Sequence, residues 1–325
     1  MEDMEEKKKK RVCVTGASGF VGSWLVKLLL SKDYIVHGTV RDPSDEKNDH
    51  LKKLDNASDN LQFFKADLLD YKSLTAAIAG CEGVFHVASS VPSSKLPNPE
   101  IEIIAPALNG TLNVLEACSE GKVKRVIVVS SLAAVGMNPS WSLDKVRNEE
   151  CWSDMEYDRR TENWYSLSKT LAEINAFDYA AKHKLDVVTV CPSLCIGPLL
   201  QATMNASSLV LISLLKGDRL SVENKVRHLV DVRDVADALL MVYEKPEASG
   251  RYICAPHAIK MSDLIDILKS MYPQYNYPNN FVEPNNEPRA SSEKLKMLGW
   301  ECRPLKETLI DTVEYYQVAG LLEKD

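Results

Sequence analysis

Two short stretches of the chain contain residue types that, taken together, could transfer a hydride. The stretch Val12–Gly22 contains three glycines, each three residues from the next. A β-branched run precedes these glycines and apolar residues at helical spacing follow them, which is the context that a dinucleotide-binding loop requires. The stretch Asn163–Lys169 contains Tyr165 and Lys169, which lie one helical turn apart. Either pattern alone is common, but both in this order indicate an enzyme that uses a dinucleotide cofactor.

The three glycines of the first stretch have separate physical roles in binding a pyrophosphate. Gly16 permits the tight turn after the strand, Gly19 has no side chain to block the phosphates, and Gly22 lets the helix pack close to the sheet. The helix begins at Phe20 and Val21, where unpaired backbone N–H groups and a partial positive charge favour an anion. An ordinary strand–turn–helix, with glycines that serve only turn geometry, is the alternative interpretation.

The end of the second expected strand indicates which dinucleotide binds. Arg41 follows the apolar run Ile35–Val40, and Lys47 lies six residues later. An acidic residue at this place usually holds the ribose of NAD, whereas an arginine suits the 2′-phosphate of NADP. We therefore predict NADP(H) as the cofactor. Asp42 keeps NAD use open, and Arg41 and Lys47 could also be solvated loop charges.

The tyrosine and lysine of the second stretch could act together as a proton donor. A free phenol has a pKa near ~10, and a neighbouring ammonium from Lys169 is expected to lower the pKa of Tyr165. The phenol can then donate a proton to a carbonyl oxygen as hydride reaches the carbon. Ser131, at the end of an expected strand, could polarise the same oxygen. The alternative is that Tyr165 and Lys169 form an ordinary surface pair.

The composition indicates a globular protein that acts on small molecules. The chain has 325 residues, 45% of them hydrophobic, and a formal net charge of −7. This negative charge argues against a nucleic-acid partner, and no apolar run approaches the ~18 residues that a membrane span needs. We therefore expect a cytoplasmic protein, without a membrane partner, that is a monomer or a weak dimer.

The start of the chain and its cysteines suggest neither export nor metal binding. Residues 1–10 form a charged leader that lacks the apolar core of a signal peptide, so we expect it to be disordered. The eight cysteines are scattered, and we expect them to be reduced core residues. Cys191 and Cys195 lack a second Cys/His pair at matching spacing, so no metal site is predicted.

Strands and helices are expected to alternate along the first 190 residues. We expect strands at 11–15, 35–40, 61–66, 83–88, 123–130 and 185–191, and helices near 20–31, 71–79, 101–120 and 164–183. This alternation predicts an α/β fold with a doubly wound parallel sheet of the Rossmann type. Further helices are expected at 209–216, at 231–244 and, two or three of them, within 260–325.

The chain is expected to divide into two lobes. We assign 11–191 and 229–250 to an NADP-binding Rossmann domain, and 192–228 and 251–325 to a smaller, discontinuous substrate lobe. Ligands of such sheets bind beyond the carboxyl ends of the strands. The cofactor and the substrate are therefore expected to meet at this edge of the sheet.

At this point the chain resembles a known family, the extended short-chain dehydrogenase/reductases. Within this family it is most similar to the plant group of cinnamoyl-CoA reductases and dihydroflavonol reductases, over residues 12 to about 322. The stretches that carry the resemblance are Thr15–Gly22, Gly38–Pro43, Ala66–Leu69, Phe85–Ser89, Cys151–Asp154, Trp164–Glu173, Gly197–Leu200, Asp231–Ala236 and Ser249–Tyr252.

The resemblance implies a role for individual positions of this chain. Ser131, Tyr165 and Lys169 match the catalytic triad of the family. Arg41 and Lys47 match the contacts to the 2′-phosphate. The other implied cofactor contacts are Asp67 and Leu68 at the adenine, Val87, Ala88 and Ser89 along the cofactor, and Pro192, Cys195 and Ser207 toward the nicotinamide.

Departures from the family pattern bear on the substrate. Cinnamoyl-CoA reductases have a histidine and a lysine, separated by two residues, where this chain has Val210 and Ser213, while Arg251 keeps the third position of that set. These residues meet coenzyme A in the family. Reduction of a free aromatic or phenylpropanoid-like aldehyde or ketone is therefore favoured over reduction of a thioester. A hydroxycinnamoyl-CoA reductase, and a catalytically silent dinucleotide-sensing regulatory protein, are the alternatives.

Overall fold

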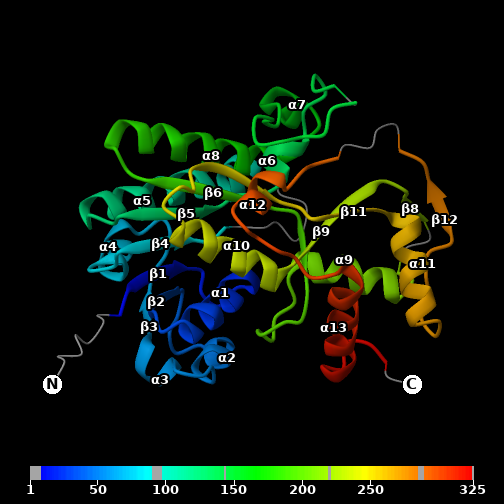
Figure 1. The fold of residues 1–325 in the computed structure, drawn as a ribbon, viewed down its shortest axis with the longest axis horizontal. Helices are drawn as coiled ribbons and strands as arrows, with labels where there is room; N and C mark the ends of the chain where they lie inside the picture. Colours follow the sequence, from blue (N-terminus) through cyan, green and yellow to red (C-terminus); the bar gives the residue numbers. More distant parts are fainter. Residues whose placement is uncertain (1–8, 90–96, 143, 219–220, 285–288, 324–325) are drawn as a thin grey trace.

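The computed structural model describes residues 9–89, 97–142, 144–218, 221–284 and 289–323. In this part of the chain the largest sheet has seven strands in the order β10-β6-β5-β4-β1-β2-β3 (Figure 1). All neighbouring strands in it are parallel. The strands are β1 (Arg11–Thr15), β2 (Ile35–Val40), β3 (Leu61–Lys65), β4 (Gly83–His86), β5 (Arg125–Val129), β6 (Val187–Pro192) and β10 (Gly250–Cys254).

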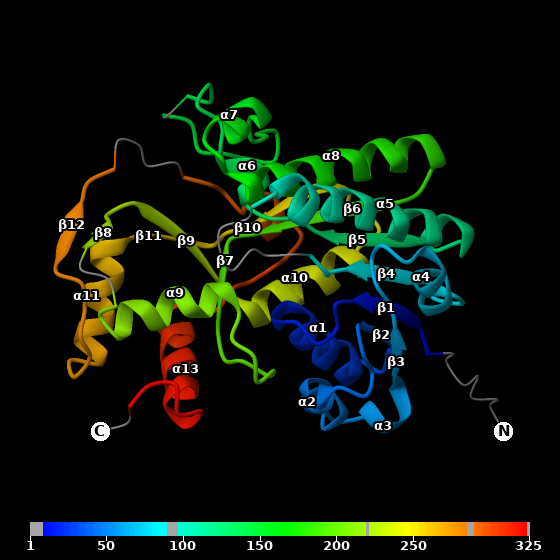
Figure 2. The same cartoon turned by 180° about the vertical axis from the view of Figure 1, so that it is seen from behind.

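Helices cover both faces of this sheet, which confirms the predicted doubly wound α/β fold (Figure 2). One face carries α1 (Phe20–Ser31) and α10 (Val232–Glu244), and the other carries α4 (Tyr71–Ile78), α5 (Ala105–Glu120) and α8 (Trp164–His183).

Successive side chains of a strand point to opposite faces, and the packing in this sheet follows that rule. Val12 and Val14 of β1 pack with α1 and α10, whereas Cys13 between them packs with α4 and α5. Strands buried on both faces read as continuous apolar runs bounded by turn residues, and this is why most strands of the sheet could be predicted.

A smaller unit lies beside the large sheet (Figure 1). Its apolar core packs three helices against a three-stranded sheet of order β11-β9-β7, and a parallel pair, β12-β8, lies at its edge. The elements are β7 (Leu194–Ile196), α9 (Ala206–Leu215), β8 (Ser221–Glu223), β9 (Val226–Asp231), β11 (His257–Lys260), α11 (Met261–Met271), β12 (Asn280–Val282) and α13 (Leu305–Val318).

Short helices connect these larger elements. They are η1 (Glu46–Asn48), α2 (Asp49–Lys52), α3 (Ala57–Asn60), the π-turn η2 (Glu100–Ile104), α6 (Ala133–Gly136), α7 (Met155–Arg160) and α12 (Glu293–Met297). The predicted helix at 101–120 is therefore a π-turn followed by α5. Pro106 lies in the first turn of α5 and cannot donate a backbone hydrogen bond to the preceding turn, so a continuous α-helix cannot pass through it.

The small unit contains strands that the sequence analysis missed. The strands β7, β8 and β12 have three residues each, too short to show a period of two. Strand β10 was also missed. It pairs with β6 as an outer strand of the large sheet, so the predicted boundary between 250 and 251 falls within a strand. The division into an NADP-binding domain and a substrate lobe stays a prediction, and residues 1–8 of the predicted leader lie outside the described part.

No helix among the described residues is long and apolar enough to cross a membrane. The described His, Cys, Asp and Glu side chains include no group of three or more that could hold a metal ion. All eight cysteines are free thiols. Six of them are buried in the hydrophobic clusters, which confirms that they serve as small core side chains.

Candidate functional site

The loop between β1 and α1 has the geometry of a dinucleotide cradle. Gly16 adopts a φ of +66°, and a Cβ at this position would lie 2.9 Å from Cα of Ala88. A Cβ on Gly22 would lie 2.2 Å from the carbonyl oxygen of Gly16, so the first turn of α1 closes against the loop only with glycine. Gly16 and Gly22 are thus required by backbone conformation and close approach, while the predicted role of Gly19 beside the phosphates stays a prediction.

The N-terminus of α1 is open to an anion. Gly19 is its N-cap residue, no side chain caps the first turn, and this turn contains no acidic residue. The twelve-residue helix therefore keeps unpaired N–H donors and a partial positive charge at the mouth of the loop, which fits a pyrophosphate. The side chain of Phe20 packs in the core of the small unit, so Phe20 and Val21 could meet a cofactor through their backbone.

Threonine and histidine side chains, which the sequence analysis did not assign to the site, fix the loop after β4. Thr15 Oγ1 accepts hydrogen bonds of 3.1 Å from the backbone N–H groups of Val87 and Ala88, and it lies 3.0 Å from His86 Nδ1. The other ring nitrogen of His86 lies 3.2 Å from Thr111 Oγ1. Burial, with a smaller effect from Lys169, lowers the pKa of His86 to about 3. His86 is thus a neutral structural residue.

The segment after β2 leaves an arginine accessible. Arg41 is exposed and makes no hydrogen bond or ion pair with the described residues. The neighbouring carboxylate of Asp42 instead accepts hydrogen bonds from the backbone (2.9 Å) and hydroxyl (2.7 Å) of Ser44. Lys47 forms an ion pair of 2.5 Å with Asp45. The arrangement at this strand end therefore favours a phosphate at Arg41 over a ribose hydroxyl at Asp42.

The other predicted adenine-side residues follow the edge strand β3. Asp67 is exposed, and its carboxylate accepts a hydrogen bond of 2.9 Å from the backbone of Leu69. Leu68 is held against α5, because its carbonyl accepts a hydrogen bond of 2.8 Å from Asn113 and a Cβ on Gly110 would lie 2.9 Å from its own Cβ. Val87, Ala88 and Ser89 lie half-buried after β4, at the same edge of the sheet.

The three predicted catalytic side chains come from two adjacent elements. Ser131 follows β5, and its side chain lies close enough to Tyr165, near the start of α8, to affect the pKa of the phenol. Lys169 lies one turn further along α8, fully inside the protein, where Nζ donates a hydrogen bond of 3.2 Å to the carbonyl of Val129. The structure therefore brings Ser131, Tyr165 and Lys169 together.

The electrostatics of this group differ from the sequence expectation. Burial raises the pKa of Tyr165, while the nearby hydroxyl of Ser131 opposes this effect. Burial lowers the pKa of Lys169 to about 8, although the nearby charge of Glu173 and the thiol of Cys191 act in the opposite direction. The expected lowering of the tyrosine pKa by Lys169 is thus wrong for this state, because desolvation outweighs the ammonium.

Residues predicted near the nicotinamide are only partly gathered. The carbonyl of Pro192, the last residue of β6, accepts a hydrogen bond of 2.8 Å from Leu132, so it lies beside Ser131. Cys195 lies close enough to Tyr165 to influence its pKa. Ser207, at the start of α9, contacts Asn205 through a hydrogen bond of 2.5 Å but none of the other predicted site residues in the described chain.

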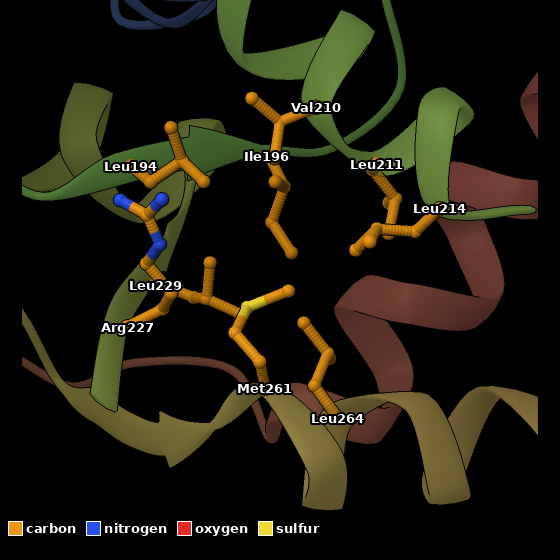
Figure 3. Close-up of a pocket in the computed structure, with 9 residues that line it drawn as sticks. All are labelled: Leu194, Ile196, Val210, Leu211, Leu214, Arg227, Leu229, Met261 and Leu264. Atoms are coloured by element: carbon orange, nitrogen blue, oxygen red, sulfur yellow. The ribbon is translucent and has the colours of Figure 1, made fainter. Parts of the chain in front are cut away.

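A small apolar pocket lies in the unit beyond β7 (Figure 3). Side chains of α9 line one side of it and those of α11 line the opposite side (Figure 3). The lining residues are Leu194, Ile196, Val210, Leu211, Leu214, Arg227, Leu229, Met261 and Leu264. Aliphatic side chains dominate its lining.

The three positions that meet coenzyme A in the resembled group have other surroundings here. Val210 lines the apolar pocket, and the hydroxyl of Ser213 donates a 2.8 Å hydrogen bond to the carbonyl of Val210. Arg251 is only 6% exposed, and its guanidinium is bonded to the carboxylate of Glu173. Arg251 thus keeps its place in the sequence but is engaged inside the protein.

A parallel sheet of this order, with a glycine loop on its first turn and a tyrosine and lysine on its longest helix, is the architecture of the extended short-chain dehydrogenase/reductases. Comparison with known families agrees with this class. The profile of the NAD dependent epimerase/dehydratase family matches residues 12–255, and the chain belongs to this family.

Relatives and solved structures resemble nearly the whole chain. It is 46% identical to cinnamoyl-CoA reductase 1 of Petunia hybrida, over 96% of this chain and 93% of that protein. It is also 46% identical to cinnamoyl-CoA reductase 2 of Medicago truncatula, over 96% of this chain and 92% of that protein. The crystal structure of vestitone reductase from alfalfa matches 97% of this chain and 100% of its own, with a TM-score of 0.83 and 32% identity. The crystal structure of the yeast methylglyoxal/isovaleraldehyde reductase Gre2 complexed with NADPH matches 96% of this chain and 100% of its own, with a TM-score of 0.82 and 27% identity.

Proposed function

We propose that this protein is an NADPH-dependent carbonyl reductase that acts on a free aromatic or phenylpropanoid-like aldehyde or ketone. The observation that carries the proposal is the proximity of the Ser131 and Tyr165 side chains, with Lys169 one turn away, at the edge of the sheet where the glycine loop opens. The names of the relatives and of the solved structures, which are reductases, support the same reaction class.

Each of the three side chains has a separate role in the reaction. NADPH supplies the hydride when it is bound. Tyr165 donates the proton to the substrate oxygen, and the Ser131 hydroxyl hydrogen-bonds the same oxygen and fixes its position. Lys169, as an ammonium beside the phenol, stabilises the negative charge that the proton leaves on Tyr165.

The choice of NADPH over NADH rests on the end of β2. A guanidinium matches the two oxygens that a phosphate offers, and Arg41 is exposed without an ion pair among the described residues. Asp42, which could have held a ribose, is already hydrogen-bonded to Ser44. The NADPH in the structure of Gre2 supports the same choice.

The preference for a free carbonyl rests on α9 and β10. Val210 and Ser213 offer no charge to a nucleotide phosphate, and Arg251 is committed to Glu173. The small pocket beside α9 is lined mainly by aliphatic side chains.

A hydroxycinnamoyl-CoA reductase is the second candidate, because the relatives that are 46% identical over nearly the whole chain are named cinnamoyl-CoA reductases. A silent dinucleotide sensor is disfavoured, because it would not need the group of Ser131, Tyr165 and Lys169. The proposal includes a cytoplasmic monomer or weak dimer, whose partner is a small carbonyl compound and not a nucleic acid.

A panel of substrates tests the proposal. NADPH oxidation is followed with free aromatic aldehydes, with ketones and with hydroxycinnamoyl-CoA thioesters, and each assay is repeated with NADH. The proposal expects the highest kcat/KM for a free carbonyl with NADPH. Efficient turnover of feruloyl-CoA at a low micromolar KM supports the second candidate, and NADPH binding without any turnover supports the sensor.

A further inference from the structure

A buried carboxylate, that of Glu173, lies one helical turn beyond Lys169 on α8. Its side chain is 0% exposed. Arg251 Nε on β10 donates to Oε1 (2.8 Å) and its Nη2 donates to Oε2 (3.2 Å). Thr189 Oγ1 on β6 donates to Oε1 (2.5 Å), and Ser130 Oγ, directly after β5, donates to Oε2 (2.6 Å). A carboxylate with donors on both oxygens is fixed in position.

The guanidinium of Arg251 is fixed as completely as its partner. Nη1 donates to the carbonyls of Glu149 (3.1 Å) and Cys151 (2.8 Å), and Nη2 also reaches the carbonyl of Ala134 (3.3 Å). Its plane lies over the ring of Trp152, with 3.5 Å between the guanidinium carbon and the ring centroid. The guanidinium of Arg251 is therefore occupied by contacts within the protein, so it holds Glu173 and is not available to a ligand.

We propose that Glu173, clamped by Arg251, is a positioning residue of the reductase site, which supplies the buried negative charge that keeps Lys169 an ammonium. The inference rests on the proposed function, since Lys169 matters only where Tyr165 is the proton donor. The same carboxylate ties α8 to Ser130, the neighbour of Ser131, so one group fixes both elements that carry the catalytic side chains.

The surroundings of Lys169 assign this task to Glu173. Lys169 donates a hydrogen bond to the carbonyl of Val129 on β5. It also lies near the thiol of Cys191 on β6 and the neutral ring of His86 on β4. Within the described chain, Glu173 provides the carboxylate that acts on Lys169. Burial already lowers the pKa of Lys169 to about 8, so without this carboxylate the amine would lose its proton near neutral pH.

A purely structural role is the rival explanation, because the Glu173–Arg251 pair also joins β10 to α8. The pH profile separates the two roles. If Lys169 must be charged, activity falls as pH rises through its pKa. Removing the negative charge of Glu173 lowers that pKa and moves the fall to lower pH, whereas loss of a structural contact reduces activity without moving the fall.

The experiment measures kcat/KM against pH from 6 to 10 with a carbonyl substrate from the panel. Glu173→Gln removes the charge, and the double variant Glu173→Gln/Arg251→Gln removes both charges, so no unpaired guanidinium remains to unfold the protein. Glu293→Gln, on the surface helix α12, is the matched control. We expect the alkaline fall to move down by about one pH unit in both Glu173 variants and to stay in place in the control.

A second measurement needs no turnover. The Kd of NADPH is measured by fluorescence titration over the same pH range, and it should rise as Lys169 loses its proton. The rise should occur at lower pH in Glu173→Gln than in the unaltered protein. It should be absent in Lys169→Met. A folded Glu173 variant whose alkaline fall coincides with that of the unaltered protein, in either measurement, overturns the inference. Absence of carbonyl reduction by the unaltered protein counts against the proposed function alone, since the binding titration still decides this inference.

Discussion

The acidity of Tyr165 depends on more than its own environment. Burial raises its pKa, and the nearby hydroxyl of Ser131 acts in the other direction. Lys169, whose Nζ is bonded to the carbonyl of Val129, does not act strongly on the phenol in this state. A neutral phenol with a high pKa is a proton donor at neutral pH, which is the state that carbonyl reduction requires.

Replacing Tyr165 with phenylalanine should abolish turnover and leave NADPH binding largely intact. The ring and its packing remain, and only the proton donor is lost. Loss of a positioned proton donor costs about 10²–10⁴-fold in rate. Steady-state kinetics and a fluorescence titration with NADPH measure the two effects. A variant with a nearly unaltered rate would mean that another group donates the proton.

Replacing Arg41 with alanine should weaken NADPH binding much more than NADH binding. The exposed guanidinium is proposed to meet the 2′-phosphate, which NADH lacks. A hydrogen bond to a charged group contributes roughly 1.5–3 kcal/mol, so we expect about a tenfold or larger loss of preference. Titration of both cofactors measures this change, with Lys65→Ala on the neighbouring strand β3 as a control. Equal losses for both cofactors would contradict the assignment.

At the scale of elements, periodicity and turn residues predicted the large sheet well. The helices α1 and α8 run over 20–31 and 164–183, as predicted. Strand β10 was missed because its partner, β6, lies about sixty residues earlier in the chain, and no local pattern records that pairing. The short strands of the small unit were missed for the same reason, since tertiary contacts and not local propensity determine them.

The candidate site was predictable where it depends on local spacing. The pair Tyr165 and Lys169 and the glycine loop are patterns within single stretches, and the structure brings Ser131 to the tyrosine as expected. The partnership of Glu173 with Arg251 joins residues 78 apart in sequence, so spacing could not reveal it. The sign of the tyrosine pKa was also beyond the sequence, because it depends on the degree of burial.

The contact between α7 and α8 contains a carboxyl that is sensitive to pH. Asp158 is fully buried, its Oδ2 lies 2.6 Å from Ser166 Oγ, and the same Ser166 oxygen lies 2.7 Å from the carbonyl of Ala133. Ser166 has one hydroxyl proton for two acceptors. Both contacts are satisfied when Asp158 is protonated and donates to Ser166. Burial indeed raises the pKa of Asp158 to about 6.

Replacing Asp158 with asparagine should therefore stabilise the protein above pH 6. The folded-state pKa lies above the unfolded value of ~3.9, so the stability this carboxyl contributes is complete below pH ~4 and is lost as pH rises through about 6. An amide keeps the proton-donor role at every pH. We expect a gain of roughly 2–3 kcal/mol at pH 8 and little change at pH 4.

Urea unfolding at several pH values measures this difference, and Asp178→Asn, at an exposed position on α8, is the control. If Asp158→Asn and the unaltered protein show parallel stability profiles between pH 4 and 8, Asp158 is ionised in the folded protein and does not donate a proton to Ser166.

Helix α9 is the element that should decide the substrate class. Changing Val210 to histidine and Ser213 to lysine would restore the two charged positions of the coenzyme A-binding pattern. Such contacts lie remote from the reacting carbon and contribute to binding. Two of them at ~1.5 kcal/mol each amount to about a hundredfold in affinity. The ratio of kcat/KM for a hydroxycinnamoyl-CoA over a free aldehyde measures the effect, and an unchanged ratio would place thioester recognition elsewhere.

At the scale of the whole molecule, two apolar cores meet along α1. Val21, Trp24 and Cys195 pack against both the core of the large sheet and that of the small unit. The indole N–H of Trp24 also donates a 2.9 Å hydrogen bond to the carbonyl of Pro198, in the loop after β7. Arg233 on α10 adds an ion pair of 2.7 Å to Asp311 on α13. The first turns of α1, which hold the proposed phosphate site, therefore also join the two units.

Because one side chain serves both cores, replacing Trp24 with alanine should weaken the coupling between them. Removing a large aromatic from a packed core costs about 3–5 kcal/mol, and since Trp24 is only half-buried we expect roughly 2 kcal/mol. The unaltered protein should unfold in one transition, detected alike by tryptophan fluorescence and far-UV circular dichroism. In Trp24→Ala the two signals should separate, as the small unit unfolds first. Trp141→Ala, in a different cluster, is the control and should lower the midpoint without separating the signals. Coincident transitions in Trp24→Ala would mean that the remaining contacts, such as that of Arg233 with Asp311, are sufficient to couple the units.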